Sequence, residues 1–371
     1  MGTRPVPSAS GRLVLDDESG SGAPGQVFGR VTLSQVAREA GVSLATASRA
    51  FNGSRDRTVR EDMRQRVLEA AERLRYQPDA NAQAMVRGRT TSIGLIVHDI
   101  ADPYFSSIAA GVGLAADAAG LTLTLASTQY DSAREPRFAE LLTRQRARAI
   151  VIAGGRIDDD EVNEHMRRAL ADFRMSGGTV ALIGQPLLGV DTVEIANRSG
   201  AADLARVLHG LGYRRFGVLR GPTGHLTATD RLEGFVEALD GLGCALDPAA
   251  VVTSAFTRDG GYEGMRALIR GPEVEVVFAV NDVMAVGAMA AARDAGLQVP
   301  ADVAVAGFDD IVTLRDISPS LTTVRVPLVE VGTTATELAL SGPSDTPRLV
   351  RVPGTVVVRD STPRTASASA G

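Results

Sequence analysis

Short apolar runs alternate with helical patterns through most of the chain, and this alternation restricts the possible folds. The runs IGLIV, LTLTLA and AIVIAG come first, and the same order resumes after residue 215 in FGVLR, VVTSAF, VVFAV and VAVAGF. Continuously apolar strands separated by helices are typical of parallel sheets covered on both faces. The sequence therefore predicts two α/β subdomains, each with its own parallel sheet. A ligand is expected between them, at the carboxyl ends of the strands.

Length and composition favour a soluble globular protein of two or three domains. The chain has 371 residues, of which 44% are hydrophobic and 22% charged, and one core does not grow to that size. No apolar run approaches the roughly 18 residues of a membrane span. The first thirty residues contain no apolar block typical of a signal peptide. We therefore expect a cytoplasmic protein that makes no contact with a membrane.

Cysteine and histidine usage argues against metal and redox chemistry. Cys244 is the single cysteine, which excludes an intrachain disulfide and a multi-cysteine metal site. The four histidines are scattered without the spacing of metal ligands. We expect no catalytic residues, no metal site and no cofactor, so the protein is not expected to be an enzyme.

The charge of the chain is unevenly distributed. Residues 31–90 contain eleven arginines against seven acidic residues, whereas the whole chain carries a net charge of -5, so the remainder sums to -9. A basic N-terminal module on an acidic body is typical of local nucleic-acid contact.

That basic module contains two helices joined by a very short turn, VTLSQVAREAGVSLATASRAFNG. Thr32 and Gln35 form a capping-box pattern, Gly41 is a helix end, and Ser43 is an N-cap for the next helix. A third helix is expected to follow, with Thr58 and Glu61 as its capping box. This spacing is typical of a helix-turn-helix that presents the outer face of its second helix to a major groove. The alternative is a small helical bundle in which the tight turn is ordinary packing.

The sequence resembles the lactose-repressor/galactose-repressor (LacI/GalR) family of bacterial transcription regulators. The likeness begins with the helix pair and RVLEAAERLRYQPDANAQAM, and continues through DPYFSSIAAGV, TATDRLEGFVEAL, VFAVNDVMAVGAM, VPADVAVAGFDD and SPSLTTVRVP. Several motifs in the family's order are far more specific than any one of them. The resemblance implies an N-terminal all-α helix-turn-helix headpiece plus an α/β periplasmic-binding-protein-like core of two parallel-sheet subdomains.

The resemblance also assigns boundaries along the chain. These are 31–76 for the DNA-binding domain, 77–90 for a hinge helix and linker, and 91–361 for the effector-binding and dimerisation core. Composition, not the resemblance, predicts a disordered leader at 1–30, which is rich in Gly, Ser and Pro, and a matching disordered tail at 362–371. Within the core, the N-subdomain is expected at 91–188 and 321–343, and the C-subdomain at 189–320 and 344–361.

The resemblance places base readout on Leu44, Ala45 and Arg49. Leu44 and Ala45 can only pack against bases, whereas Arg49 can donate two hydrogen bonds to guanine, a contact worth about 1–3 kcal/mol of discrimination. Contacts to phosphate are implied for Thr32, Ser43, Thr46, Ser48 and Asn52. For these polar side chains helix capping is an equal alternative.

The segment PDANAQAM resembles the family's hinge helix, which inserts into the minor groove. Ala82 and Met85 would make that contact, with Met85 in place of the usual wedging leucine. A helix this short is marginal alone in water, so it is expected to form only when two copies pack together on DNA. The alternative is the apolar stripe of a linker helix.

The resemblance implies an effector cleft in the core. Its six expected residues are Tyr104, Phe105, Arg231, Phe256, Asn281 and Asp309. Aromatic walls with an arginine, an amide and a carboxylate suit a sugar or another small polar molecule. The alternatives are structural roles: Arg231 starts a helix, Asp309 caps a helix, and the aromatic residues belong to the core.

Three departures from the family pattern qualify these expectations. The loop between Asn52 and Val59 is about two residues longer than usual, and Arg60 replaces a common capping serine, so that Thr58 is the expected cap. Ala196 stands where many relatives have an acidic residue, which loosens the inference of a plain sugar.

The function implied is an effector-controlled repressor of carbohydrate-utilisation genes that binds a palindromic DNA operator as a homodimer. No tetramerising heptad follows Arg359. Alternatives are a regulator responding to a non-sugar molecule and, less favoured, a solute-binding protein, which would not need residues 32–85. A dehydrogenase is disfavoured because GVGLAADAAG is not GxGxxG and falls inside a predicted helix.

Overall fold

The computed structural model describes residues 31–52, 59–77 and 90–365. The chain divides into two compact units, Met1–Asp79 and Ala80–Gly371. The first contains the helical headpiece and the second contains the α/β core. The predicted leader and nearly all of the predicted hinge lie outside the described residues.

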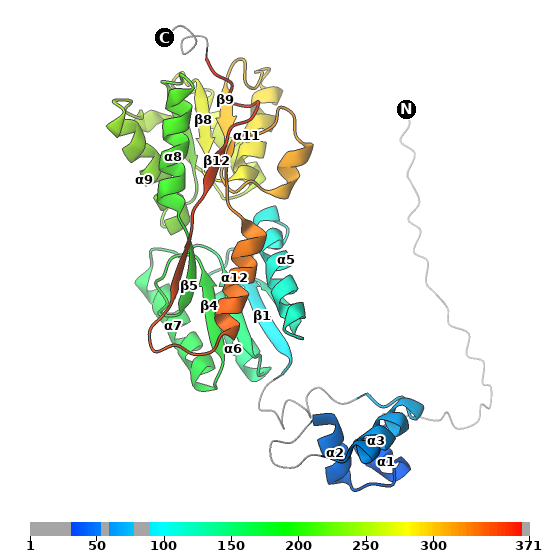
Figure 1. The fold of residues 1–371 in the computed structure, drawn as a ribbon. Coiled ribbons are helices and arrows are strands. Elements are labelled where there is room, and N and C mark those ends of the chain that lie inside the picture. Colours follow the sequence, from blue (N-terminus) through cyan, green and yellow to red (C-terminus); the bar gives the residue numbers. More distant parts are fainter. Residues whose placement is uncertain (1–30, 53–58, 78–89, 366–371) are drawn as a thin grey trace, which may run out of the picture. The chain divides into compact units, whose positions relative to one another are not determined.

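The headpiece is built from three helices around a small apolar core (Figure 1). Their bounds are α1 (Leu33–Glu39), α2 (Leu44–Asn52) and α3 (Glu61–Arg73). The buried side chains are Val36, Ala37, Ala40, Ala47, Ala50, Val67, Ala70 and Ala71. Phe51 packs its ring 5.6 Å from that of Tyr76.

The turn between α1 and α2 is closed by backbone hydrogen bonds. Gly41 adopts a left-handed φ of 64°. Its N–H donates to the carbonyl of Arg38 at 3.2 Å, and the N–H of Val42 donates to that of Ala37 at 3.0 Å, the pattern of a Schellman cap. Arg66 of α3 donates to the carbonyl of Ala40 at 2.7 Å. The third helix therefore holds the turn that sets the direction of α2.

The start of α3 differs from the expected capping box. Arg60 occupies the N-cap position without a capping side-chain hydrogen bond. It pairs instead with Asp62 at 2.6 Å. Thr58, the predicted cap, lies outside the described residues.

The first subdomain of the core contains a six-stranded parallel sheet in the order β11-β5-β4-β3-β1-β2. The strands are β1 (Ser92–Val97), β2 (Thr122–Ser127), β3 (Ala149–Ala153), β4 (Thr179–Ile183), β5 (Asp191–Ile195) and β11 (Leu349–Val352). Helices α5 (Pro103–Ala118) and α12 (Leu328–Leu340) cover one face, and α6 (Arg134–Arg144) and α7 (Asp160–Met175) cover the other (Figure 1). Strands buried on both faces explain the unbroken apolar runs.

Glycines allow two of these helices to approach closely. A Cβ on Gly111 of α5 would lie 1.9 Å from the carbonyl oxygen of Val329 in α12, and one on Gly332 would lie 2.2 Å from that of Ile108. Real Cβ atoms do not approach an oxygen so closely, so the contact between α5 and α12 depends on both glycines.

The second subdomain contains a four-stranded parallel sheet in the order β7-β6-β8-β9. Its strands are β6 (Phe216–Arg220), β7 (Val251–Thr253), β8 (Val276–Ala279) and β9 (Ala304–Ala306). Its helices are α8 (Asn197–Gly210), α9 (Leu226–Gly241), α10 (Arg258–Leu268) and α11 (Asp282–Asp294), with short 3-10 turns η1 (Pro248–Ala250) and η2 (Val312–Asp316). Two parallel sheets in two subdomains are as predicted.

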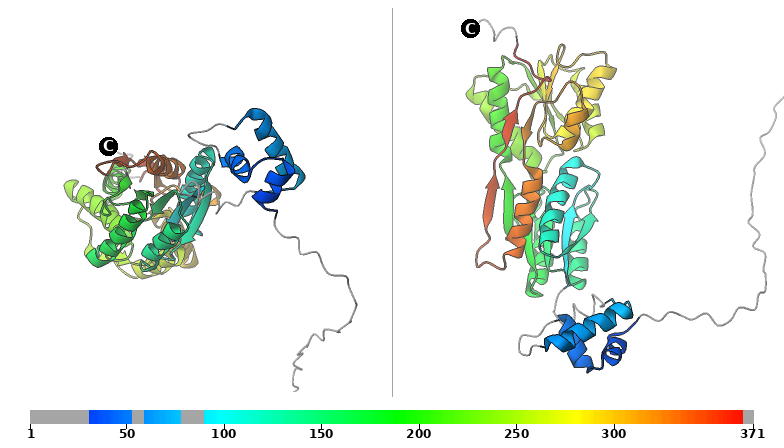
Figure 2. Two further views of the ribbon diagram at one scale, coloured as in Figure 1. Left: turned by 90° about the horizontal axis from the view of Figure 1, so that it is seen from below. Right: turned by 45° about the vertical axis from the view of Figure 1, so that its right-hand side comes forward.

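A small antiparallel pair completes the fold, formed by β10 (Thr323–Arg325) and β12 (Thr355–Val357). The chain passes between the subdomains before α8, before α12 and between β11 and β12. The right-hand view of Figure 2 shows the C-terminal segment, in red, running alongside both subdomains.

Two predicted boundaries inside the core are wrong. The division at 188/189 assigned β5 to the C-subdomain, but β5 pairs with β4 in the first sheet. The division at 343/344 did the same for β11, which pairs with β5. β5 directly follows β4 in the chain and lies beside it in the sheet, so the expected division was placed one strand too early. β11 lies at the edge of the sheet and reaches it only after the whole second subdomain, so it was not adjacent in sequence to the block it completes.

The predicted disordered tail begins too early. Thr362 is fully buried, and its hydroxyl lies 2.7 Å from that of Thr322. Tyr213 donates its hydroxyl to the carbonyl of Pro363 at 2.9 Å. Residues 362–365 therefore pack on the second subdomain, while 366–371 lie outside the described residues.

Within the ranges that the structure describes, no helix is long and apolar enough to cross a membrane.

Candidate functional site

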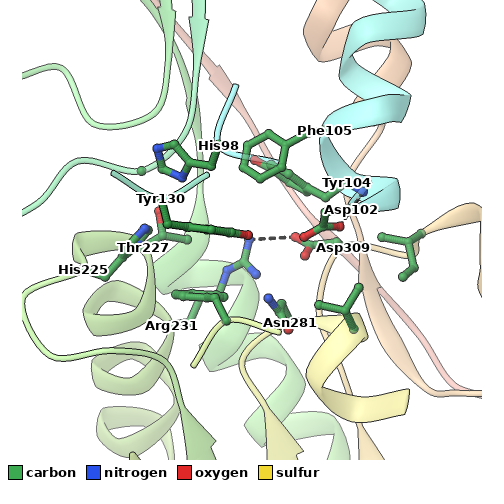
Figure 3. A pocket seen from close by; sticks show the side chains of 14 residues that line it. His98, Asp102, Tyr104, Phe105, Tyr130, His225, Thr227, Arg231, Asn281 and Asp309 are labelled. Atoms are coloured by element: carbon green, nitrogen blue, oxygen red, sulfur yellow. Dashed lines mark hydrogen bonds and ion pairs between the residues drawn. The ribbon is translucent and has the colours of Figure 1, made fainter. Parts of the chain in front are cut away.

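One cavity in the core is lined by all six residues of the predicted effector cleft. These are Tyr104, Phe105, Arg231, Phe256, Asn281 and Asp309. The cavity has a volume of about 40 Å³. Figure 3 shows the side chains of five of them converging, with Tyr104 and Phe105 on α5 and Arg231, Asn281 and Asp309 facing them.

The site residues follow the carboxyl ends of strands in both sheets, as expected for parallel α/β subdomains. From the first sheet come side chains after β1 and β2, and from the second come side chains after β6, β7, β8 and β9. Because strands of a parallel sheet end at the same edge, residues far apart in sequence meet here. The cavity is thus a product of the topology.

Arg231 is the central charged group of the cavity. It lies in the middle of α9, not at its start, and is only 2% exposed. Its Nη2 donates to Asp309 Oδ1 at 2.7 Å, its Nη1 to the carbonyl of Val280 at 2.7 Å, and its Nε to Asn197 Oδ1 at 2.8 Å. The guanidinium also stacks on the ring of Phe308 at 3.8 Å. Protein groups alone therefore fix its position.

Asp309 sits on a strained loop between β9 and η2. Its φ is 116°, and that of the next residue, Asp310, is 57°, both in a region that side chains other than glycine rarely adopt. Burial raises the pKa of Asp309 to about 6, although Arg231 opposes this shift. Its carboxylate pairs with Arg231 and does not cap a helix.

Asn281 and Asp282 connect the site to the hinge between subdomains. Asn281 caps α11 by accepting a hydrogen bond from the N–H of Met284 at 2.9 Å. The fully buried Asp282 accepts from the Thr323 hydroxyl at 2.7 Å and from the N–H of Ile311 at 3.0 Å. Burial raises the pKa of Asp282 well above its ordinary value, and the charge of Asp309 adds to this.

Aromatic rings form the walls of the cavity. His98 lies 5.4 Å from Phe105, 5.2 Å from Tyr130 and 6.1 Å from His225, measured between ring centroids. His225 in turn lies 4.8 Å from Phe256. Phe105 is also part of the buried core, so the structural alternative for this residue holds beside its place at the site.

Several residues of the site were not predicted from the sequence. They are His98, Asp102, Tyr130, Asn197, His225 and Thr227. Asn197 follows the departure at Ala196 in the segment VEIANRSGA, and its contact with Arg231 gives that segment a role. Thr227 lies in the first turn of α9, and the others lie in loops after strands, a position that itself could have marked them. Positive φ angles at Gln129 and Tyr130 add strain to one of those loops.

Hydrogen bonds cross the cleft between the two subdomains. The N–H of Asp158 donates to the carbonyl of Gly224 at 2.7 Å, and that of Leu226 to the carbonyl of Arg156 at 2.9 Å. Gln185 Nε2 donates to Asp230 Oδ2 at 3.1 Å. These contacts hold the subdomains together beside the cavity.

The residues predicted to read bases lie on the outer face of α2. Leu44 is 51% exposed. Ala45 is exposed. Arg49 folds back along the helix, where its Nε donates to the carbonyl of Ala45 at 2.9 Å. All three point away from the apolar core of the headpiece, as the helix-turn-helix prediction requires.

The residues predicted to contact phosphate include two that cap helices. Gln35 Oε1 accepts a hydrogen bond from the N–H of Thr32 at 2.7 Å. Ser43 Oγ accepts from the N–H of Thr46 at 3.1 Å and lies 2.8 Å from its hydroxyl. Ser48 is half-buried on α2, and Asn52 is its last residue. The hinge residues Ala82 and Met85 lie outside the described residues.

Comparison with protein families gives two matches. Residues 32–79 match "Bacterial regulatory proteins, lacI family", and residues 205–362 match "Periplasmic binding protein-like domain". The chain is 35% identical over 321 residues to the HTH-type transcriptional regulator GalS of Salmonella typhimurium, covering 85% of this chain and 91% of that protein.

Solved structures show the same architecture. A complex of the transcriptional regulator CelR with cellobiose is 30% identical, with a TM-score of 0.66 over 90% of this chain and all of the other. The lac repressor dimer bound to operator and an anti-inducer has a TM-score of 0.78 with the same coverage at 24% identity.

Proposed function

Since the chain belongs to the LacI family of bacterial transcription regulators, we propose that it represses carbohydrate-utilisation genes under the control of a small polar effector. It acts as a homodimer on a palindromic operator, and this places it in the cytoplasm, where operator DNA is. The single observation that carries the effector assignment is the convergence of all six predicted residues on one cavity.

The headpiece supports sequence-specific binding to DNA. Leu44 and Ala45 supply apolar surface for contacts such as a thymine methyl group, whereas Arg49 supplies hydrogen-bond donors. Because its Nε is bonded to the carbonyl of Ala45, the two Nη atoms are those that reach guanine. The side chains of Thr32, Ser43, Thr46, Ser48 and Asn52 would contact phosphates, and capping by Ser43 would orient its hydroxyl for both roles.

The core supports an effector with several hydroxyl groups. Arg231 has five N–H donors, and its three bonds to the protein leave others for a ligand. The carboxylate of Asp309 and the amide of Asn281 add acceptors and a donor, and the aromatic walls offer faces for a sugar ring. The solved structure of the regulator CelR, which is similar to this chain, is a complex with cellobiose.

A homodimer follows from the symmetry of such an operator. Two headpieces related by a two-fold axis read two half-sites of a palindrome. The predicted hinge helix, with Ala82 and Met85 in the minor groove, is too short to be stable alone and would gain a partner helix in the dimer.

A genome-wide binding map tests the regulator, followed by operator titrations with purified protein. Replacing Arg49 with Ala should cost about 1–3 kcal/mol of binding and relax the preference at one symmetric pair of base positions. An Arg38→Ala variant is the control, because Arg38 lies exposed on α1. A uniform loss on all DNA sequences in the Arg49 variant would make that residue a phosphate contact, and no preferred sequence in the map would refute the proposal.

A further inference from the structure

A second cavity adjoins the effector cavity on the side of the first subdomain. It has a volume of about 160 Å³ and shares His98, Tyr130 and His225 with the first. Its other walls include Glu135, Arg156 and the exposed Thr223. We refer to this second cavity as the annex. It offers four times the volume of the cavity that the six predicted residues line.

The annex contains buried polar atoms without hydrogen-bond partners. Glu135 and Arg156 are only 2% and 4% exposed, and Arg156 Nη2 donates to Glu135 Oε2 at 2.6 Å. Glu135 Oε1, Arg156 Nε and His225 Nδ1 find no hydrogen-bond partner in the described part of the chain. His98 Nε2 lies 3.5 Å from Glu135 Oε1, too far for a good hydrogen bond. Buried polar atoms are nearly always paired, so these three need an external partner.

The charges in the annex favour a neutral partner. Burial favours the neutral form of Glu135, but His98 and Arg156 beside it lower the pKa of its carboxyl to about 2, so it is ionised. Its negative charge balances the guanidinium of Arg156. Burial lowers the pKa of His225 to about 3, so its ring is neutral. A phosphate would meet the carboxylate of Glu135, and a cation would meet Arg156, whereas a hydroxyl can both donate to Glu135 and accept from Arg156.

We propose that the annex is a second sugar subsite and that the effector is a neutral sugar of two rings. One ring occupies the cavity of Arg231 and Asp309, and the hydroxyls of the other bond to Glu135 and Arg156. This inference rests on the proposed function, because it names the effector class of the same site.

Contacts around the annex connect its occupant to both subdomains. Ile157, on its wall, forms a β-bridge with His225, and the carbonyl of Arg156 accepts a hydrogen bond across the cleft from the N–H of Leu226. The second ring therefore lies where the loops after β3 and β6 meet. Binding of the second ring would therefore depend on the relative position of these two loops.

Calorimetric titration of the full-length chain tests this inference. The probes are glucose and galactose, the neutral disaccharides cellobiose, melibiose and trehalose, and glucose 6-phosphate. We expect one disaccharide to bind at least about tenfold more tightly than either monosaccharide, as one or two added buried hydrogen bonds would give. Thr223→Phe, an exposed position on the annex wall, should remove that advantage and leave monosaccharide binding unchanged. Phe256→Ala, in the first cavity, should weaken both.

Glu135→Gln is the second variant, since it keeps the shape of the side chain and removes its charge. It should lower disaccharide affinity about tenfold with monosaccharide affinity preserved, and that preserved binding shows that the variant is folded. The inference is overturned if a monosaccharide or glucose 6-phosphate binds as tightly as the best disaccharide, if no disaccharide binds, or if both variants bind like the wild type. Binding of the full-length chain to its operator is measured separately. If the chain binds no operator, the proposed function is refuted; if it binds the operator but the sugar results contradict the expectation, only the annex inference fails.

Discussion

At the scale of single residues, the cavity depends on a buried ion pair that the protein holds without a ligand. Arg231 uses its Nε, Nη1 and Nη2 on Asn197, Val280 and Asp309. A buried charge is tolerated only with such partners, and removal of one partner leaves the other uncompensated. In the proposed function, the same pair that stabilises the core would therefore present polar groups to an effector.

Replacing Arg231 with Met should destabilise the core by roughly 3–5 kcal/mol, because Asp309 is then buried without its partner. The double variant Arg231→Met/Asp309→Asn should recover most of that loss, since neither of these two positions then carries a buried charge. Both should lose effector binding. Guanidinium chloride denaturation and calorimetric titration measure the two effects, and a double variant that is no more stable than the single one would contradict the account of the pair.

Asp102 gives the stability of the core a pH dependence. Burial raises the pKa of Asp102 to about 6 from its ordinary value of 3.8, against the hydrogen bond from the N–H of Tyr104. The folded state therefore holds the proton more tightly, and this favourable contribution is present below pH 4 and lost as the pH rises through 6.

In Asp102→Asn this titration is absent, while asparagine can still cap α5. The free energy of unfolding of the wild type should therefore fall more between pH 4 and 6 than that of the variant. Asp309 titrates in both proteins. Because the charge of Asp102 helps to raise the pKa of Asp309, the variant also reduces this second contribution, which changes the comparison in the same direction. Denaturation curves at several pH values measure the difference, and parallel profiles would contradict it.

Sequence motifs predicted the polar residues of the cavity, whereas its other residues were identified only from the tertiary structure. Arg231, Asn281 and Asp309 could be predicted because each belongs to a short family motif. His98 and His225 could not, because their role depends on the meeting of loops from two sheets, 127 residues apart in sequence. The annex likewise could not be predicted from the sequence, since Glu135 lies on a helix and Arg156 in a loop, and only the fold brings them together.

At the scale of elements, helix contacts depend on glycines at specific positions. Gly111 and Gly332 place the backbones of α5 and α12 against each other. Similar contacts occur at Gly234 of α9 against Arg198 of α8, and at Gly287 of α11 against Arg258 of α10. Each pair of helices therefore packs as one layer beside its sheet.

Replacing Gly111 with Ala should destabilise the core by at least about 1–3 kcal/mol, because the new methyl group would overlap the carbonyl of Val329. Gly113→Ala is a matched control on the same helix, where the nearest atom to a new Cβ lies 4.0 Å away. The control should be neutral or stabilise by up to about 1 kcal/mol through helix propensity. Thermal unfolding compares them, and equal effects would contradict the close contact.

The order of elements was more predictable from sequence than their membership in a sheet. Apolar runs identified β1, β3, β6, β8 and β9 because burial on both faces leaves a clear pattern. The edge strands β2 and β7 were identified too, although they are only partly buried. The strands β5 and β11 were assigned to the wrong subdomain. β11 is an edge strand with two exposed positions, and its register is set by a partner 157 residues away. β5 lies inside the sheet between β11 and β4, but the expected division fell before it. Topology, not local pattern, decides where such a strand pairs.

At the scale of the whole molecule, the proposed function requires that effector and operator act through one shared equilibrium. The effector site lies between two subdomains that the chain joins in three places and that hydrogen bonds hold across the cleft. A ligand that binds one arrangement of the subdomains more tightly shifts the population toward it. Within a dimer, that shift would alter the spacing of the two hinge helices and hence the affinity for DNA.

The most direct test of this claim is a fluorescence-anisotropy titration of labelled operator with the full-length protein, with and without the sugar that binds most tightly. The account predicts that saturating sugar changes operator affinity about 5–150-fold, a coupling of about 1–3 kcal/mol, and that the operator changes sugar affinity by the same factor. Identical operator affinity at saturating sugar would contradict it.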